Sequence, residues 1–104
     1  DYLEALGFSV VHDVALGVPS GDYPHVPPSK WLEVTRDNLR DEADGIFLSC
    51  TNTTQIDIIG ALEAETGKPV VNSNQATIWA ALKRLEQKLG HSPRPASLGA
   101  LMRR

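Results

Sequence analysis

Short segments rich in β-branched and aromatic residues alternate along this chain with longer segments of helical periodicity, and this alternation constrains the fold more than any other feature. The predicted strands cover residues 8–14, 45–49 and 69–72. The predicted helices are one that ends at Gly7 and three that cover residues 28–43, 55–66 and 75–89. Strands that alternate with helices predict a parallel sheet with helices on both faces, a three-layer α/β fold of the flavodoxin-like kind.

The carboxyl ends of the predicted strands lie at one edge of such a sheet, because right-handed crossovers run all strands in the same direction. Ligands of open parallel sheets bind at this edge. Three segments follow the strands there: a Gly- and Pro-rich loop at 15–27, the sequence SCTNTTQ at 49–55 and the sequence NSNQ at 72–75. We therefore expect a functional site where these three segments meet.

The composition narrows the classes of partner and compartment. A formal net charge of -3 argues against nucleic acid and anionic membranes as partners, since both bind concentrated basic surfaces. The sequence has one cysteine, no apolar run of about 20 residues and no signal-peptide pattern, so we expect a cytoplasmic protein without disulfides. Three histidines without metal-ligand spacing and the lack of a Gly-rich phosphate loop indicate neither a metal site nor a nucleotide cofactor.

Cys50 is the residue whose position most strongly suggests chemistry. It follows the predicted strand at 45–49 and precedes a helix expected to begin near Thr53 or Thr54. A thiol there faces the N–H groups and the positive dipole end of the helix, which stabilise a thiolate that can act as base, nucleophile or, once protonated, acid. The alternative is an inert cysteine buried at the end of a core strand, which is a common position for this residue.

Polar residues beside the cysteine and at the next strand end could hold an anionic substrate. The N–H groups and side chains of Thr51 and Asn52 suit a carboxylate or an enolate oxygen. Ser73 and Asn74 follow the third predicted strand and lie at the same edge of the sheet. Helix capping is the alternative role: Asn52 or Thr53 would cap the helix after the cysteine, and one residue of the NSN sequence would cap the last helix.

Other cysteine chemistries lack their partner residues in this sequence. A thioredoxin-type motif needs a second Cys where Thr53 stands, and a phosphatase loop needs an Arg where Ile56 stands. A triad with His12 and Asp13 is disfavoured, because adjacent strand residues point to opposite faces of a sheet. A non-catalytic α/β binding or regulatory module is the rival from another class, and as a response regulator it would use Asp13 as the phosphorylated residue.

Residues 44–82 have the sequence DGIFLSCTNTTQIDIIGALEAETGKPVVNSNQATIWAAL, which resembles the second half of maleate isomerases and related members of the aspartate/glutamate racemase superfamily. The resemblance rests on residues 49–52, on the helix end ALEAETGKPVV and on residues 72–77, and it extends over roughly residues 1–90. It implies two similar α/β halves that face each other across a cleft and use no cofactor. This chain would then be a Cys-bearing half-domain at 1–90 with a tail at 91–104, and we expect the missing amino-terminal half of the same protein as its partner, within a homo-oligomer.

By this resemblance, Cys50 is the second-half cysteine of a cofactor-independent isomerase or racemase that acts on a small carboxylic or dicarboxylic acid. In maleate isomerases one thiolate adds to the double bond to permit rotation, and the thiol of the other half is its acid or base partner. In arylmalonate decarboxylases a lone second-half cysteine protonates an enediolate, and glycines usually follow it. Because Thr51 and Asn52 follow Cys50 here, the sequence favours a maleate isomerase-like activity, with an arylmalonate decarboxylase-like lyase as the alternative.

Overall fold

Two short parallel strands lie at the centre of the computed structural model, which describes residues 2–91 and 95–104. β1 (Ile46–Leu48) pairs with β2 (Val70–Asn72) in parallel. Both strands fall inside segments predicted as strands, and their parallel pairing confirms the α/β class expected from the alternation of the sequence. The carboxyl ends of the two strands therefore meet at one edge of the sheet.

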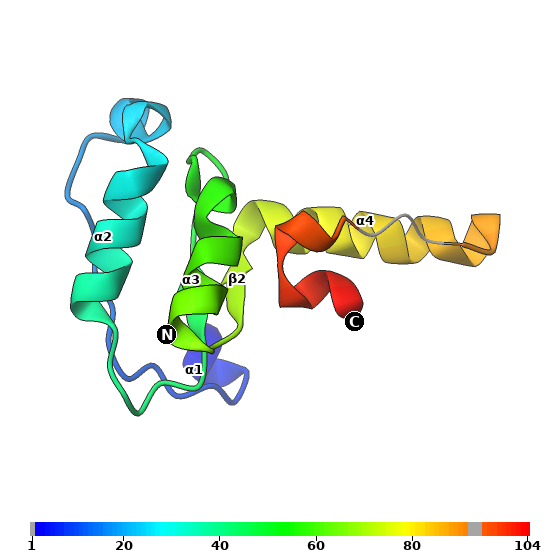
Figure 1. Ribbon diagram of the computed structural model, residues 1–104, viewed down its shortest axis with the longest axis horizontal. Helices are drawn as coiled ribbons and strands as arrows, with labels where there is room; N and C mark the ends of the chain where they lie inside the picture. Colours follow the sequence, from blue (N-terminus) through cyan, green and yellow to red (C-terminus); the bar gives the residue numbers. More distant parts are fainter. Residues whose placement is uncertain (1, 92–94) are drawn as a thin grey trace.

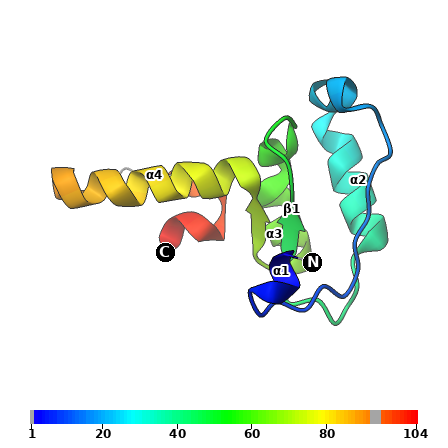
Figure 2. The same cartoon turned by 180° about the vertical axis from the view of Figure 1, so that it is seen from behind.

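The connection between the strands consists of η2 (Gln55–Ile58) and α3 (Ile59–Thr66), which together occupy the helix predicted at 55–66. α3 lies alongside the sheet in both views (Figures 1 and 2). Apolar side chains from the strands and from this connection form the buried core: Leu48, Ile58, Ile59, Leu62 and Val70. The core is therefore local to one strand–helix–strand unit, which is the unit that a parallel pair requires.

Three further helical segments precede the sheet: α1 (Tyr2–Ala5), η1 (Ser20–His25) and α2 (Pro28–Asn38). α2 begins at its proline as predicted, because proline fits the first turn of a helix, where the N–H group has no helical partner. It ends at Asn38, before the predicted end at residue 43. Trp31 and Leu32 of this helix pack against the buried core.

The prediction of a strand at residues 8–14 was wrong. These residues are described by the structure and form neither helix nor strand. Phe8, Val11 and Val14 are 63%, 45% and 49% exposed. A β-rich composition shows only that a segment suits a pleated surface, whereas a strand forms where a neighbour completes its ladder. Among the described residues the sheet has two strands, so the parallel α/β character is established but the three-layer arrangement is not.

The longest helix, α4 (Ser73–Leu89), begins where β2 ends and projects away from the sheet (Figures 1 and 2). It starts two residues before the predicted helix at 75–89 and is followed by Gly90, which has a left-handed conformation with φ 74°. Apolar side chains of this helix are partly exposed, and Leu85 and Leu89 are 48% and 57% accessible.

The carboxyl-terminal segment, defined as residues 95–104, folds back beside the start of α4 (Figure 1). Its two short helices, η3 (Ala96–Leu98) and η4 (Ala100–Arg103), contact α3, β2 and α4. Met102 of this segment is 1% exposed and belongs to the buried interior. Across residues 2–91 and 95–104, no helix has the length and apolar character of a membrane span.

Candidate active site

Cys50 lies just beyond the carboxyl end of β1, and its side chain is exposed. Its backbone has φ 95°, and it is the only non-glycine residue with a positive φ in the part of the chain that the structure describes. Such a conformation costs roughly 1–3 kcal/mol and persists only where surrounding contacts impose it. The cysteine is thus held in position by its neighbours, and the alternative of an inert core thiol does not fit its exposure.

The first turn of α4 supplies two of these contacts. Ser73 Oγ accepts a hydrogen bond from the Cys50 N–H at 3.1 Å. Asn74 Nδ2 donates to the Thr51 carbonyl oxygen at 3.0 Å. The structure therefore brings together four of the residues that the sequence proposed for the site, and it does so at the shared edge of the two strands. Asn52, the fifth, is exposed in the same loop.

The helix after Cys50 begins at Gln55, where the helix predicted at 55–66 starts, and not at Thr53 or Thr54. Residues 51–54 form bends, and η2 starts at Gln55 as a 3₁₀ turn. The expectation that Asn52 or Thr53 caps this helix was wrong, because Thr54 occupies the N-cap position and donates instead to the Val26 carbonyl oxygen at 2.8 Å. The helix start that directly contacts the Cys50 loop is the start of α4, through Ser73.

Asn72 caps α4, as the sequence predicted for one residue of the NSN corner. Its Oδ1 accepts from the N–H groups of Asn74 and Gln75, at 2.9 and 3.2 Å. Gln75 Oε1 in turn accepts from the Asn72 N–H at 3.1 Å, which completes a capping box. The N-x-x-Q spacing of this motif was the available sequence signal for the structural role of Gln75.

A buried polar network lies beneath the Cys50 loop, and sequence reasoning missed it. Gln55, Asn72 and Gln75 are 3%, 0% and 0% exposed. Asn72 Nδ2 donates to Gln55 Oε1 at 2.8 Å and to the Leu48 carbonyl oxygen at 3.3 Å. These bonds fix the end of β1 to the start of η2, and thus fix both ends of the loop that carries Cys50.

Cys50 lies on the wall of an open groove with a volume of about 1740 Å³. The groove runs between residues 7–16, α2 and β1, and most of its lining is apolar, including Phe8, Phe47 and Leu48. His12 and Asp13 also line it, but nothing in the structure pairs them with the thiol. Within the described part of the chain, no three His, Cys, Asp or Glu residues group closely enough to hold a metal ion.

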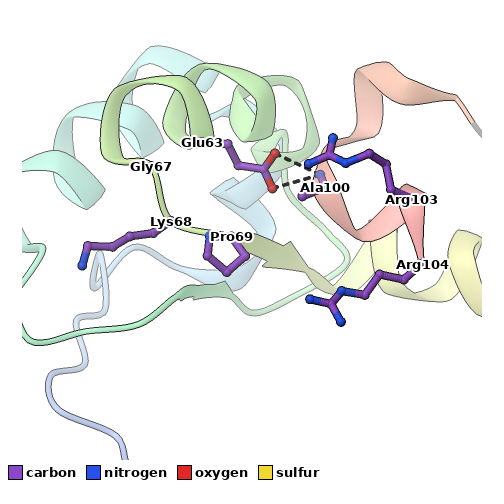
Figure 3. A pocket seen from close by; sticks show the side chains of 7 residues that line it. All are labelled: Glu63, Gly67, Lys68, Pro69, Ala100, Arg103 and Arg104. Carbon is purple, nitrogen blue, oxygen red and sulfur yellow. Dashed lines mark hydrogen bonds between the residues drawn. The ribbon is translucent and has the colours of Figure 1, made fainter.

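A second hollow of about 320 Å³ lies at the opposite end of β2, beside Pro69 (Figure 3). Its walls carry Arg103 and Arg104, and the Glu63 carboxylate faces the backbone of Ala100 across it. The Ala100 N–H donates to both Glu63 carboxylate oxygens, at 3.1 and 2.9 Å. Lys68 also lines this hollow, and its Nζ donates to the carbonyl oxygens of Asp41 and Ala43. Through its bonds to the Ala100 N–H, Glu63 attaches the carboxyl-terminal segment to α3.

Comparison with known proteins identifies the family of this chain. No curated protein and no solved structure matches the chain. A family model described as arylmalonate decarboxylase matches residues 1–102. This match covers nearly the whole sequence, including the Cys50 loop, the NSN corner and most of the carboxyl-terminal segment. The chain therefore belongs to the arylmalonate decarboxylase family, within the aspartate/glutamate racemase-like superfamily.

Proposed function

We propose that this chain is the cysteine-bearing half of a cofactor-independent enzyme in which the Cys50 thiol protonates the α-carbon of a small carboxylic acid after decarboxylation. The observation that carries the proposal is the exposed thiol at a parallel strand end, held at φ 95° by the first turn of α4 on the wall of a groove. In the intact protein a second α/β half would face Cys50 across this groove.

The reaction needs two events at one carbon atom. The bond from the α-carbon to one carboxylate breaks with loss of carbon dioxide, and its electron pair passes into an enediolate on the remaining carboxylate. The Cys50 S–H then donates its proton to the α-carbon, and the thiolate regains a proton from water. Apolar groove walls favour loss of carbon dioxide, because they remove the solvation of the carboxylate that leaves.

In this proposal, four polar residues of the Cys50 loop and of the first turn of α4 hold the carboxylate that stays. Ser73 Oγ accepts from the Cys50 N–H, and a hydroxyl that accepts can still donate its own hydrogen. Asn74 Nδ2 donates one hydrogen bond to the Thr51 carbonyl oxygen, and the second N–H of this primary amide can donate to the substrate. Thr51 and Asn52 are exposed beside Cys50. Uncharged donors of this kind stabilise an enediolate without forming an ion pair with the thiolate.

Maleate cis–trans isomerisation is the second candidate, and the polar pair Thr51–Asn52 after Cys50 is the observation that favours it. In that reaction the Cys50 thiolate would add to one carbon of the double bond, the resulting single bond would rotate, and elimination of the thiolate would release fumarate. Both candidates place the Cys50 sulfur at the reacting carbon, and they differ in the substrate and in the role of the sulfur, which is a proton donor in decarboxylation and a nucleophile in isomerisation.

The test uses the intact protein with phenylmalonate and with maleate as separate substrates. Carbon dioxide release measures the first reaction, and loss of maleate absorbance measures the second. Replacing Cys50 by Ser or Ala is expected to lower kcat by roughly 100-fold or more, since a positioned acid contributes this much. Ser97→Ala, on the exposed surface of the carboxyl-terminal segment, is the control and should leave turnover unchanged. Undiminished turnover by the Cys50 variants, or no turnover of either acid by the wild-type protein, would refute the proposal.

A further inference from the structure

We infer that Gln75 is a positioning residue that couples the docking of the carboxyl-terminal segment to the geometry of the Cys50 loop. The inference concerns the site proposed above and depends on that function only for its kinetic readout. The two regions meet at the first turn of α4: Gln75 contacts Leu98 on one side and Asn72 on the other.

Both ends of the Gln75 side-chain amide are engaged. Oε1 accepts from the Asn72 N–H at 3.1 Å, and Nε2 donates to the Leu98 carbonyl oxygen at 2.5 Å. The side chain is fully buried, so loss of either bond would leave a polar group without water to replace the partner. The capping box uses only Oε1, and the bond from Nε2 therefore serves the carboxyl-terminal segment.

Asn72 carries the connection from Gln75 to the cysteine. Its Nδ2 holds the Leu48 carbonyl oxygen and Gln55 Oε1, which lie before and after the Cys50 loop. Ser73, the next residue, holds the Cys50 N–H. A shift of the first turn of α4 would therefore move both ends of the loop and the group that supports the backbone of Cys50.

The carboxyl-terminal segment is held against the rest of the fold by contacts that do not involve Gln75. The Ala100 N–H binds the Glu63 carboxylate (Figure 3), and the same carboxylate accepts from the Val70 N–H at 3.1 Å. Met102 is buried at 1% exposure. The Leu98 carbonyl thus has a defined position relative to the sheet, and Gln75 transmits that position to the cysteine at φ 95°.

The variant Gln75→Glu separates the two functions of this side chain. The glutamate keeps an oxygen that can accept from the Asn72 N–H, but it places a second carboxylate oxygen against the Leu98 carbonyl, where wild type has a donor. Gln87→Glu makes the same chemical change at an exposed position of the same helix and is the matched control. Met102→Ala loosens the carboxyl-terminal segment without altering Gln75.

The first readout is the rate at which iodoacetamide alkylates Cys50 in each folded variant, which needs no substrate. Because Cys50 is already exposed, loosening the loop adds no access to the thiol, and it releases the Cys50 backbone from Ser73 and so from the first turn of α4. We expect Gln75→Glu and Met102→Ala to slow alkylation by about fivefold or more, and Gln87→Glu to leave it unchanged. Rates in the folded variants equal to or above wild type would overturn the inference, and if Gln75→Glu does not fold, Met102→Ala decides alone.

The second readout is turnover of phenylmalonate or maleate. Gln75→Glu is expected to lower kcat by roughly 10- to 100-fold and also to raise KM, because a shift of the first turn of α4 displaces the reacting sulfur together with Ser73 and Asn74, which hold the carboxylate in the proposed function. Its kcat relative to wild type should recover as pH falls through the pKa of the new glutamate, which burial beside the Leu98 carbonyl oxygen raises above the ordinary glutamate range, because the protonated acid can donate to that oxygen. A deficit independent of pH would overturn the role of the Nε2 donor. If wild type turns over neither acid, the proposed function fails while the alkylation rates still decide the coupling.

Discussion

Replacing Gly99 by alanine tests how closely the carboxyl-terminal segment packs on the body of the fold. Gly99 has φ 93° and ψ -177°, a conformation that residues with a Cβ atom rarely adopt. A Cβ atom placed there would lie 2.6 Å from Ile59 Cγ2 and 3.1 Å from both Gln75 Nε2 and Glu63 Oε1. The substitution therefore introduces backbone strain and a steric overlap at the same residue.

The two contributions can be estimated separately. The backbone conformation costs a non-glycine residue about 1–3 kcal/mol. Ile59 is fully buried, so it cannot move aside without disturbing the core, and overpacking of this kind costs about 1–3 kcal/mol. Together they predict that Gly99→Ala lowers the free energy of unfolding by roughly 2–6 kcal/mol. For a domain of this size the lower limit corresponds to a fall in Tm of about 8 °C or more.

Urea denaturation and thermal melting followed by circular dichroism measure this change in the intact protein. Gly60→Ala is the control, because Gly60 lies in α3 with nothing within 4 Å of its Cβ position. It should raise the free energy of unfolding by about 0.4–1 kcal/mol, since alanine restricts the unfolded chain and favours helix. The reasoning is refuted if Gly99→Ala is as stable as wild type, because the segment would then not pack on Ile59 as described.

Three further predictions concern the core, the site and the surface. Leu62 is fully buried, so Leu62→Ala should lower the free energy of unfolding by about 2–5 kcal/mol in urea titrations, and a smaller loss than this range would argue against a closed core. Ser73→Ala removes the acceptor for the Cys50 N–H and should lower kcat roughly tenfold in steady-state assays. The free energy of unfolding should fall by no more than about 1 kcal/mol. An unaltered kcat would contradict the role of this contact. The hydrogen bond and charge of Arg36 lower the pKa of Glu65, so the stabilisation from this pair is present above the ordinary glutamate range and lost as pH falls through the lowered value. In a plot of Tm against pH, Glu65→Gln should therefore show a slightly smaller fall of Tm at acid pH than wild type. High salt should remove this difference because both side chains are exposed. A fall of Tm in the variant as large as in wild type at low salt would argue against the pair.

The parts of the fold that sequence reasoning predicted well are those in which local signals agree with tertiary context. β2 and α4 lie close to their predicted positions because two valines, of which Val70 is fully buried, are followed by an asparagine cap with glutamine three residues later. The segment 8–14 has equally strong β-rich composition but forms no strand, since composition carries no information on whether a partner strand is present. The docking of residues 95–104 depends on Glu63, Gln75 and Gly99, which are far apart in sequence, and no local pattern reports it.

The candidate site was predictable in position and not in detail. Parallel topology was enough to place Cys50 beside Ser73 and Asn74, because both loops follow strands of one sheet. The positive φ of Cys50 and the pairing of Gln55 with Asn72 follow from the three-dimensional path of the loop and could not be read from residue types. The family match confirms the racemase-like superfamily expected from the sequence, whereas the preference for maleate isomerisation stays a prediction.

The central claim, that the sulfur of Cys50 takes part in the reaction, is tested most directly by titrating the wild-type protein with iodoacetamide. The extent of alkylation at Cys50, read by mass spectrometry, is compared at each time point with the remaining decarboxylase or isomerase activity. We predict that activity falls in proportion to the alkylated fraction and that a saturating dicarboxylate substrate slows both changes equally. Full activity in protein whose Cys50 is completely alkylated would contradict the claim.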